Sequence, residues 1–184
     1  MLDELYGMFT QNLLLTYLLG LPAIGMLVRR KQSIALHGAL VLLFCTVNAG
    51  LLYLIRPLFR FSEGNQFLPA VCVLLNAAVL GILYLPVHFR GGAYRKPLTV
   101  QLCAAAYSCA VIGMLMMSVD AVPDALSAMQ RGLRQGGGYL LCCLMLAGAR
   151  PMLCSEKMPA AFRGTRGVYL YAAVLAAAAA CLTA

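Results

Sequence analysis

Eight cysteines are the residues of this chain that could bind a metal or form disulfides. They lie at positions 45, 72, 103, 109, 142, 143, 154 and 181. No C-x-x-C pattern and no His-rich run accompanies them, so their spacing indicates neither a zinc site nor a disulfide framework. Most of them fall inside apolar runs, where cysteine usually serves as a small buried side chain. Spacing alone therefore assigns no chemistry to any of them.

One cysteine, Cys109, belongs to a short stretch that occurs once in each half of the chain. The two copies are residues 21–25 (LPAIG) and 109–113 (CAVIG). Gly20, Pro22 and Gly25 weaken a helix around the first copy. In the second copy, small or polar residues lie at the corresponding positions 108, 109 and 113. Broken helices at corresponding depths of two halves indicate a functional site at the bilayer centre. Close packing of two helices over small residues is the alternative interpretation.

The composition of the chain determines which elements carry these two stretches. Of its 184 residues, 62% are hydrophobic and 11% are charged, and the mean hydropathy is +0.85. Soluble domains have about a quarter of their residues charged, so an integral membrane protein is predicted. Runs of about 20 apolar residues fit helices better than the alternating strands of a barrel. We predict six spans, at about 9–28, 33–55, 67–89, 97–119, 132–149 and 167–182, in a single membrane domain.

The basic residues predict the orientation of these spans. The net charge is +8, but the lysines and arginines lie in short gaps between apolar runs, so no nucleic-acid partner is inferred. Ten of the fourteen lie after spans one, three and five, and four lie on the opposite side. The positive-inside rule then places both termini outside a bacterial cytoplasmic (inner) membrane. Halves of three spans each, about 1–96 and 97–184, would form an inverted repeat with interrupted helices 1 and 4.

Several polar residues within the spans need partners. Gln11 and Asn12 are expected to form helix–helix hydrogen bonds. His37 is expected near the interface as a solvated group, whereas Asn48 lies deeper and should have a partner. The glycines of the fifth run predict a flat face for close helix contact; they are at 132, 136, 137 and 138.

Five stretches of the chain resemble the small six-span subunits of the Rnf and sodium-translocating NADH:quinone reductase (Nqr) complexes, most closely the RnfA/NqrE type. They are residues 11–12 (QN), 19–25 (LGLPAIG), 56–58 (RPL), 108–113 (SCAVIG) and 158–164 (MPAAFRG). The resemblance covers nearly the whole chain. It implies the fold predicted above and, as a partner, the homologous six-helix RnfE/NqrD-type subunit, together with the other subunits of the complex.

The resemblance also implies a cofactor. In that family two such subunits each contribute two mid-membrane cysteines, one per half, to a shared [2Fe–2S] cluster. Carried over to this chain, the second-half ligand is Cys109, whereas the first-half position is Leu21, which cannot bind iron. Ser108 stands where the family has an asparagine. Cys45 or Cys103 could substitute for the missing ligand, although nothing in the sequence places either at the site.

Three functions follow as hypotheses. The first is a membrane subunit of an Rnf/Nqr-like complex that couples ferredoxin or NADH oxidation to ion movement and helps to carry electrons. The second is a structural subunit that has lost its redox centre, which Leu21 favours. The third is a small solute or ion transporter with broken helices. Against the third, the spans contain no acidic residue, which a cation-coupled carrier usually keeps.

Overall fold

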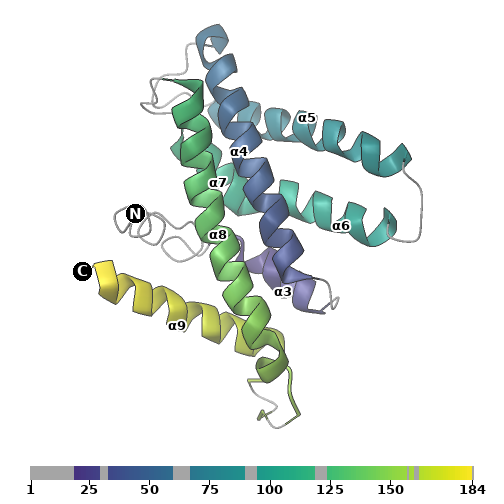
Figure 1. Cartoon of the computed structure of the whole chain (residues 1–184), viewed down its shortest axis with the longest axis vertical. Helices are drawn as coiled ribbons and strands as arrows, with labels where there is room; N and C mark the ends of the chain where they lie inside the picture. The colour runs from purple at the N-terminus through teal and green to yellow at the C-terminus, as the bar shows by residue number, and fades with distance from the viewer. Residues whose placement is uncertain are drawn as a thin grey trace.

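The regular secondary structure of the described residues is all α-helix. A computed structural model describes residues 19–29, 33–59, 67–89, 95–118, 124–156, 158–159 and 162–183 (Figure 1). The helices in chain order are α3 (Leu21–Arg29), α4 (Ile34–Phe59), α5 (Leu68–Phe89), α6 (Arg95–Ala106), α7 (Cys109–Met117), α8 (Ala125–Leu153) and α9 (Thr165–Thr183).

Helices α4 and α8 form the centre of the fold and run antiparallel along most of their length (Figure 1). Glycines on α8 allow this close approach. A Cβ atom on Gly132 would lie 2.7 Å from the carbonyl oxygen of Cys45, and one on Gly136 would lie 2.8 Å from the Cα atom of Leu42. The predicted glycine face is therefore confirmed at these two positions, because any larger side chain there would force the helices apart.

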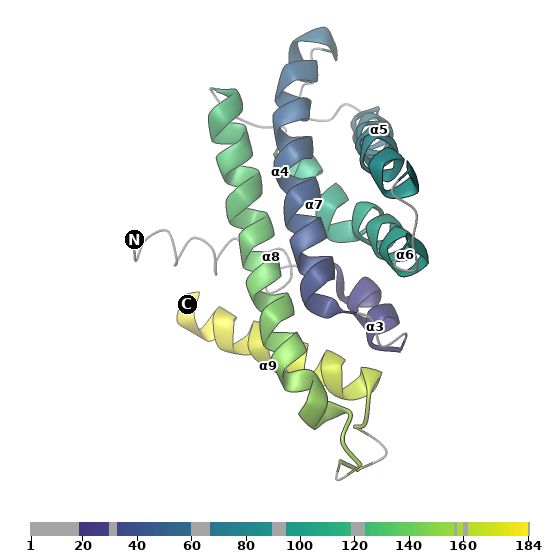
Figure 2. The same ribbon diagram turned by 45° about the vertical axis from the view of Figure 1, so that its right-hand side comes forward.

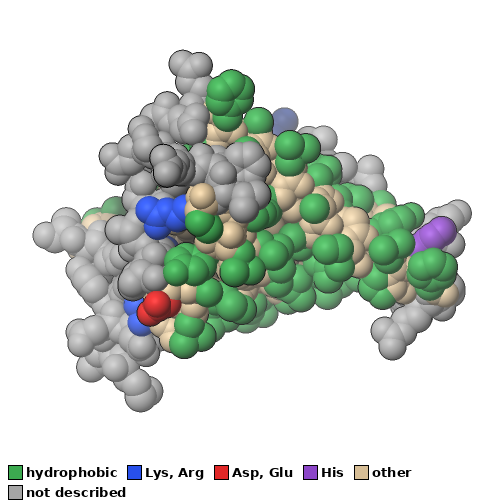
Figure 3. All heavy atoms as spheres, turned by 90° about the horizontal axis from the view of Figure 1, so that it is seen from above, with side chains coloured by type: hydrophobic (Ala, Val, Ile, Leu, Met, Phe, Trp, Pro, Cys, Tyr) green, Lys and Arg blue, Asp and Glu red, His purple; other side chains and the backbone are tan. Residues whose placement is uncertain are grey.

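The remaining helices extend to either side of the α4–α8 pair. Helices α5 and α6 lie next to each other on one side, α9 projects towards the other, and the short helices α3 and α7 lie between (Figures 1 and 2). Large apolar side chains of α5, such as Leu74 and Ile82, are exposed. Hydrophobic side chains also cover most of the described surface in the view of Figure 3. Such a surface suits lipid or a membrane partner.

Four stretches of helix are long and apolar enough to cross a membrane: Ile34–Pro57, Leu68–Phe89, Pro97–Met117 and Ala125–Leu153. A shorter apolar helix covers Thr165–Cys181. These findings support a multi-pass membrane protein, and the four stretches contain most of the predicted second, third, fourth and fifth spans. The shorter helix covers most of the predicted sixth span. Of the predicted first span, residues 9–18 lie outside the described residues, as do Gln11 and Asn12.

The helix that carries the predicted fifth span begins before it. Helix α8 begins at Ala125, about two turns before Gly132. The cause is a local cap: the backbone N–H of Asp124 donates to Ser127 Oγ at 3.2 Å, and that hydroxyl donates back to the Asp124 carbonyl oxygen at 2.9 Å. This cap satisfies backbone groups at the helix start, so the helix begins among polar residues that hydropathy alone excludes.

Candidate functional site

The predicted interruption of the fourth span is present. Helix α6 ends at Ala106 and α7 begins at Cys109, with Tyr107 and Ser108 between them. Ser108 is the N-cap of α7, with an extended backbone (φ −67°, ψ 132°), and its hydroxyl accepts a hydrogen bond from the Ala110 N–H at 3.3 Å. A short polar residue at this position thus ends one helix and starts the next. The Cys109 side chain at the start of α7 is exposed.

In the first half a helix likewise begins at the repeated stretch. Gly20 has φ +91°, a conformation that side chains rarely adopt, and helix α3 begins at the next residue, Leu21. Pro22 lies in the first turn of α3, where its missing N–H costs nothing. Helices α3 and α7 each contain nine residues and begin at the equivalent positions 21 and 109. Each copy of the sequence repeat thus begins a short helix, and the part of the first predicted span before residue 19 lies outside the described residues.

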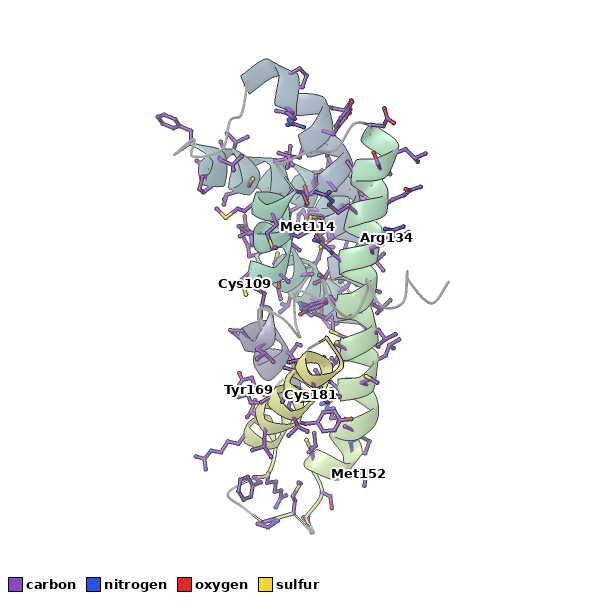
Figure 4. The ribbon with its side chains drawn as sticks, turned by 90° about the vertical axis from the view of Figure 1, so that its left-hand side faces the viewer. Cys109, Met114, Arg134, Met152, Tyr169 and Cys181 are labelled. Atoms are coloured by element: carbon purple, nitrogen blue, oxygen red, sulfur yellow. The ribbon has the colours of Figure 1, made fainter. Side chains whose placement is uncertain are left out.

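The structure brings these two helix starts together. The Gly20 N–H donates a hydrogen bond to Cys109 Sγ at 3.0 Å. On the neighbouring turn, a Cβ atom on Gly113 would lie 2.7 Å from Leu19 Cδ1, so Gly113 leaves room for that side chain. Figure 4 shows Cys109 next to α3. We call this meeting of residues 19–21 with residues 107–109 the junction; the residue before Leu21 contacts Cys109 there.

The electrostatics of the junction favour negative charge. The N-termini of α3 and α7 both lie there, and the N-terminal end of a helix carries partial positive charge from its unpaired N–H groups. One such group, the Gly20 N–H, already contacts Cys109 Sγ.

The prediction for His37 was wrong. The side chain is 0% exposed, and its Nε2 atom lies 3.4 Å from the hydroxyl oxygen of Tyr139. Helix α8 packs directly over this part of α4, since a Cβ atom on Gly38 would lie 2.8 Å from Cys143 Cβ. The imidazole therefore has a protein partner within the fold and does not reach the solvent.

Tyr139 is a residue of the junction that the sequence reasoning missed. Its hydroxyl would lie 2.6 Å from a Cβ atom on Gly20, so the end of the tyrosine ring occupies the place of a Gly20 side chain. The hydroxyl also lies close to Ser108 and Cys143. The spacing 132, 136, 139 continues the glycine face of α8 at helical periodicity, and this signal could have located the tyrosine.

Two asparagines support the other side of the break. Asn48 donates from Nδ2 to Asn76 Oδ1 at 2.9 Å, which confirms that Asn48 has a partner. Asn76 in turn donates from Nδ2 to the carbonyl oxygen of Ala106. That carbonyl belongs to the last residue of α6, where the helix itself provides no donor. The amide pair thus satisfies a backbone group left unpaired by the break.

The donor atoms at the junction do not fit half of a four-thiolate cluster. Among the described residues, no group of three or more His, Cys, Asp or Glu side chains could hold a metal ion. Cys45 is buried against Gly136 in the α4–α8 interface, and Cys103 lies on α6 before the break. The described part of the chain therefore shows one thiol at the junction, Cys109, in place of the two that a conventional half-site requires.

The chain is similar to curated bacterial proteins over most of its length, although no family model matches it. It is 25% identical over 170 residues to the RnfA protein of the ion-translocating oxidoreductase complex of Cereibacter sphaeroides, covering 91% of this chain and 87% of that protein. The corresponding protein of Rhodobacter capsulatus is 27% identical over 167 residues, which cover 89% of this chain and 86% of that protein. The corresponding protein of Colwellia psychrerythraea is 24% identical over 156 residues, which cover 84% of this chain and 80% of that protein.

Proposed function

We propose that this chain, a distant homologue over most of its length of the RnfA proteins of ion-translocating oxidoreductase complexes, is a membrane subunit of an Rnf-type complex. It would lie in the bacterial cytoplasmic membrane and pair with a homologous six-helix subunit of the RnfE/NqrD type. Chemistry that needs flavin, nicotinamide or soluble iron–sulfur domains would reside in other subunits, because the apolar helices account for most of this chain.

One observation carries this proposal: the similarity extends over both helix breaks. A match that covers 91% of the chain includes both Leu21 and Cys109. The two breaks meet through the Gly20–Cys109 hydrogen bond. The relatives and this chain thus share the part of the sequence in which the two halves come together.

The finer topology is part of the proposal. Six spans in two oppositely oriented halves, with both termini outside, are supported by the distribution of basic residues and by the equivalent half-helices α3 and α7. Reporter fusions at the two termini test the orientation. A periplasmic reporter should be active at both ends, and activity of a cytoplasmic reporter at either end would contradict the topology.

The redox role depends on whether Cys109 binds metal. Because the junction shows one thiol, we derive no electron-transfer step through a [2Fe–2S] cluster. Two features support Cys109 as one ligand of an iron centre completed by the partner protein: its side chain is exposed, and its sulfur accepts an N–H hydrogen bond, as cluster sulfurs do. Leu21 supports the alternative, a structural subunit that keeps the fold and the pairing surface.

The experiment is purification of the tagged chain from its native membrane under conditions that keep complexes intact. Co-purification of a homologous membrane protein together with flavin- or ferredoxin-type subunits is expected, and recovery of the chain alone would contradict the proposal. Iron, acid-labile sulfide and electron paramagnetic resonance are then compared in the wild type and in Cys109→Ser. The matched control is Cys181→Ser, which alters an exposed thiol on α9 (Figure 4).

The two redox outcomes are distinct. Iron that is lost in Cys109→Ser and kept in Cys181→Ser assigns Cys109 to a metal centre. An intact complex whose iron content and electron transfer are the same in Cys109→Ser as in the wild type assigns the chain a structural role. Specific binding of a solute by the isolated chain would instead favour the transporter.

A further inference from the structure

Tyr139 connects the two halves of the junction to the central helix pair. It is the largest fully buried side chain in the described part of the chain, at 0% exposed. From α8 its hydroxyl reaches His37 on α4, the Cα side of Gly20 before α3, and the neighbourhood of Ser108 before α7. A single side chain therefore links the starts of α3 and α7 to both central helices.

We propose that Tyr139, held in place by His37, is a positioning residue that keeps the Gly20 N–H on the sulfur of Cys109. Gly20 is held from two sides: its nitrogen contacts Cys109 Sγ at 3.0 Å, and the tyrosine ring covers its Cα atom. A shift of the ring would let Gly20 move away from the sulfur. The importance of this contact for redox chemistry rests on the proposed function, but the contact itself does not.

The His37 contact explains why the tyrosine ring stays in place. A hydroxyl buried in an apolar interior must be hydrogen-bonded, and the bond is stronger there than in water. His37 Nε2 supplies the partner, whereas His37 Nδ1 has none among the described residues. With the imidazole proton on Nε2, His37 donates to the Tyr139 hydroxyl oxygen and no imidazole N–H is left unpaired. The Tyr139 O–H is then free to point towards Ser108 and Cys143.

A second tyrosine provides a matched control. The hydroxyl of Tyr169, on α9, covers Gly25 of α3 in the same way, since a Cβ atom on Gly25 would lie 1.9 Å from it. Tyr169 is 40% exposed, and Figure 4 shows it on the opposite side of α3 from Cys109. Tyr169→Phe therefore removes a tyrosine hydroxyl from a glycine of the same helix without disturbing the junction.

The test measures hydrogen exchange at the Gly20 amide. The full chain is labelled with [15N]glycine, placed in lipid nanodiscs without metal, and followed by nuclear magnetic resonance; Gly20→Ala identifies the signal. Tyr139→Phe should speed exchange of Gly20 roughly tenfold, the effect of losing about 1.4 kcal/mol of hydrogen bonding. Cys109→Ala, which removes the acceptor, should speed it at least as much. Tyr169→Phe should leave it unchanged.

The glycines of the α4–α8 interface distinguish positioning from general stability. If Tyr139 positions the junction, Gly20 exchanges faster while Gly38 and Gly132 keep their rates. Unchanged Gly20 exchange in Tyr139→Phe, with faster exchange in Cys109→Ala, would overturn the proposal. Should Tyr139→Phe speed exchange at every glycine, His37→Leu, which removes the partner of the Tyr139 hydroxyl, is measured instead. An unchanged Gly20 rate in that variant would equally overturn the proposal. The measurement needs neither iron nor partner, so its outcome is independent of the complex purification.

Discussion

Gly20 and Cys109 are joined by a hydrogen bond 3.0 Å long, although 89 positions separate them in the chain. Each residue lies at the start of a nine-residue helix, α3 or α7. The two copies of the sequence repeat thus begin two short helices whose N-terminal ends meet. Substitutions at this contact, and at the residues that support it, should have distinct and measurable effects.

A thiol introduced at Leu21 should form a disulfide with Cys109. The residue before Leu21 donates its N–H to the Cys109 sulfur, so a cysteine at Leu21 would place a second thiol at the junction. We expect Leu21→Cys to give this cross-link under mild oxidation, detected by mass spectrometry of non-reduced peptides. Ala23→Cys, which faces the other way on α3, should not form it. Equal cross-linking of both variants would show that the junction is wrongly placed.

Gly20→Ala should destabilise the chain by about 1–3 kcal/mol. The φ of +91° disfavours any side chain, and the new methyl group would meet the buried ring of Tyr139. Thermal unfolding in detergent gives the comparison. The control is Gly148→Ala on α8, where nothing lies within 4 Å of the added atom and helix propensity predicts no loss. A Gly20→Ala chain as stable as Gly148→Ala would contradict the prediction.

Asn76→Leu should cost more stability than Asn48→Leu. The first change leaves both the Asn48 amide and the Ala106 carbonyl oxygen without their partner, whereas the second removes a single hydrogen bond. With each buried hydrogen bond in a membrane protein worth about 0.6–1.7 kcal/mol, the difference should be about 1 kcal/mol. Unfolding of the two variants in denaturant measures it. Equal losses would mean that the carbonyl of α6 finds another donor.

Gly132→Val should separate the central helices. The branched side chain would meet the backbone carbonyl of Cys45, which cannot move without displacing α4. We expect a loss of about 2 kcal/mol or more, in the range of overpacked cores. Cross-linking between cysteines placed on α4 and α8 should also slow. Gly81→Val on α5 is the control, because that glycine has open space around its Cα atom.

Prediction from sequence succeeded where the cause was local. An apolar run of the right length becomes a helix because its backbone must bond to itself in lipid, which is why α5 occupies Leu68–Phe89 almost as predicted. The break before Cys109 was likewise readable, since a small polar residue caps a helix through its own side chain. Helix α8 begins before its apolar run because a cap at Asp124, which hydropathy does not register, starts the helix there.

By itself, the sequence determined a helical membrane protein, the approximate limits of most apolar helices, and two equivalent weak points at Gly20 and Cys109. Only the tertiary structure decided that these weak points touch, that His37 is buried, and that Tyr139 lies over Gly20. The reason is physical: hydropathy and capping act within a few residues, whereas a buried side chain finds its partner across helices. Which helices become neighbours depends on how all their surfaces pack together.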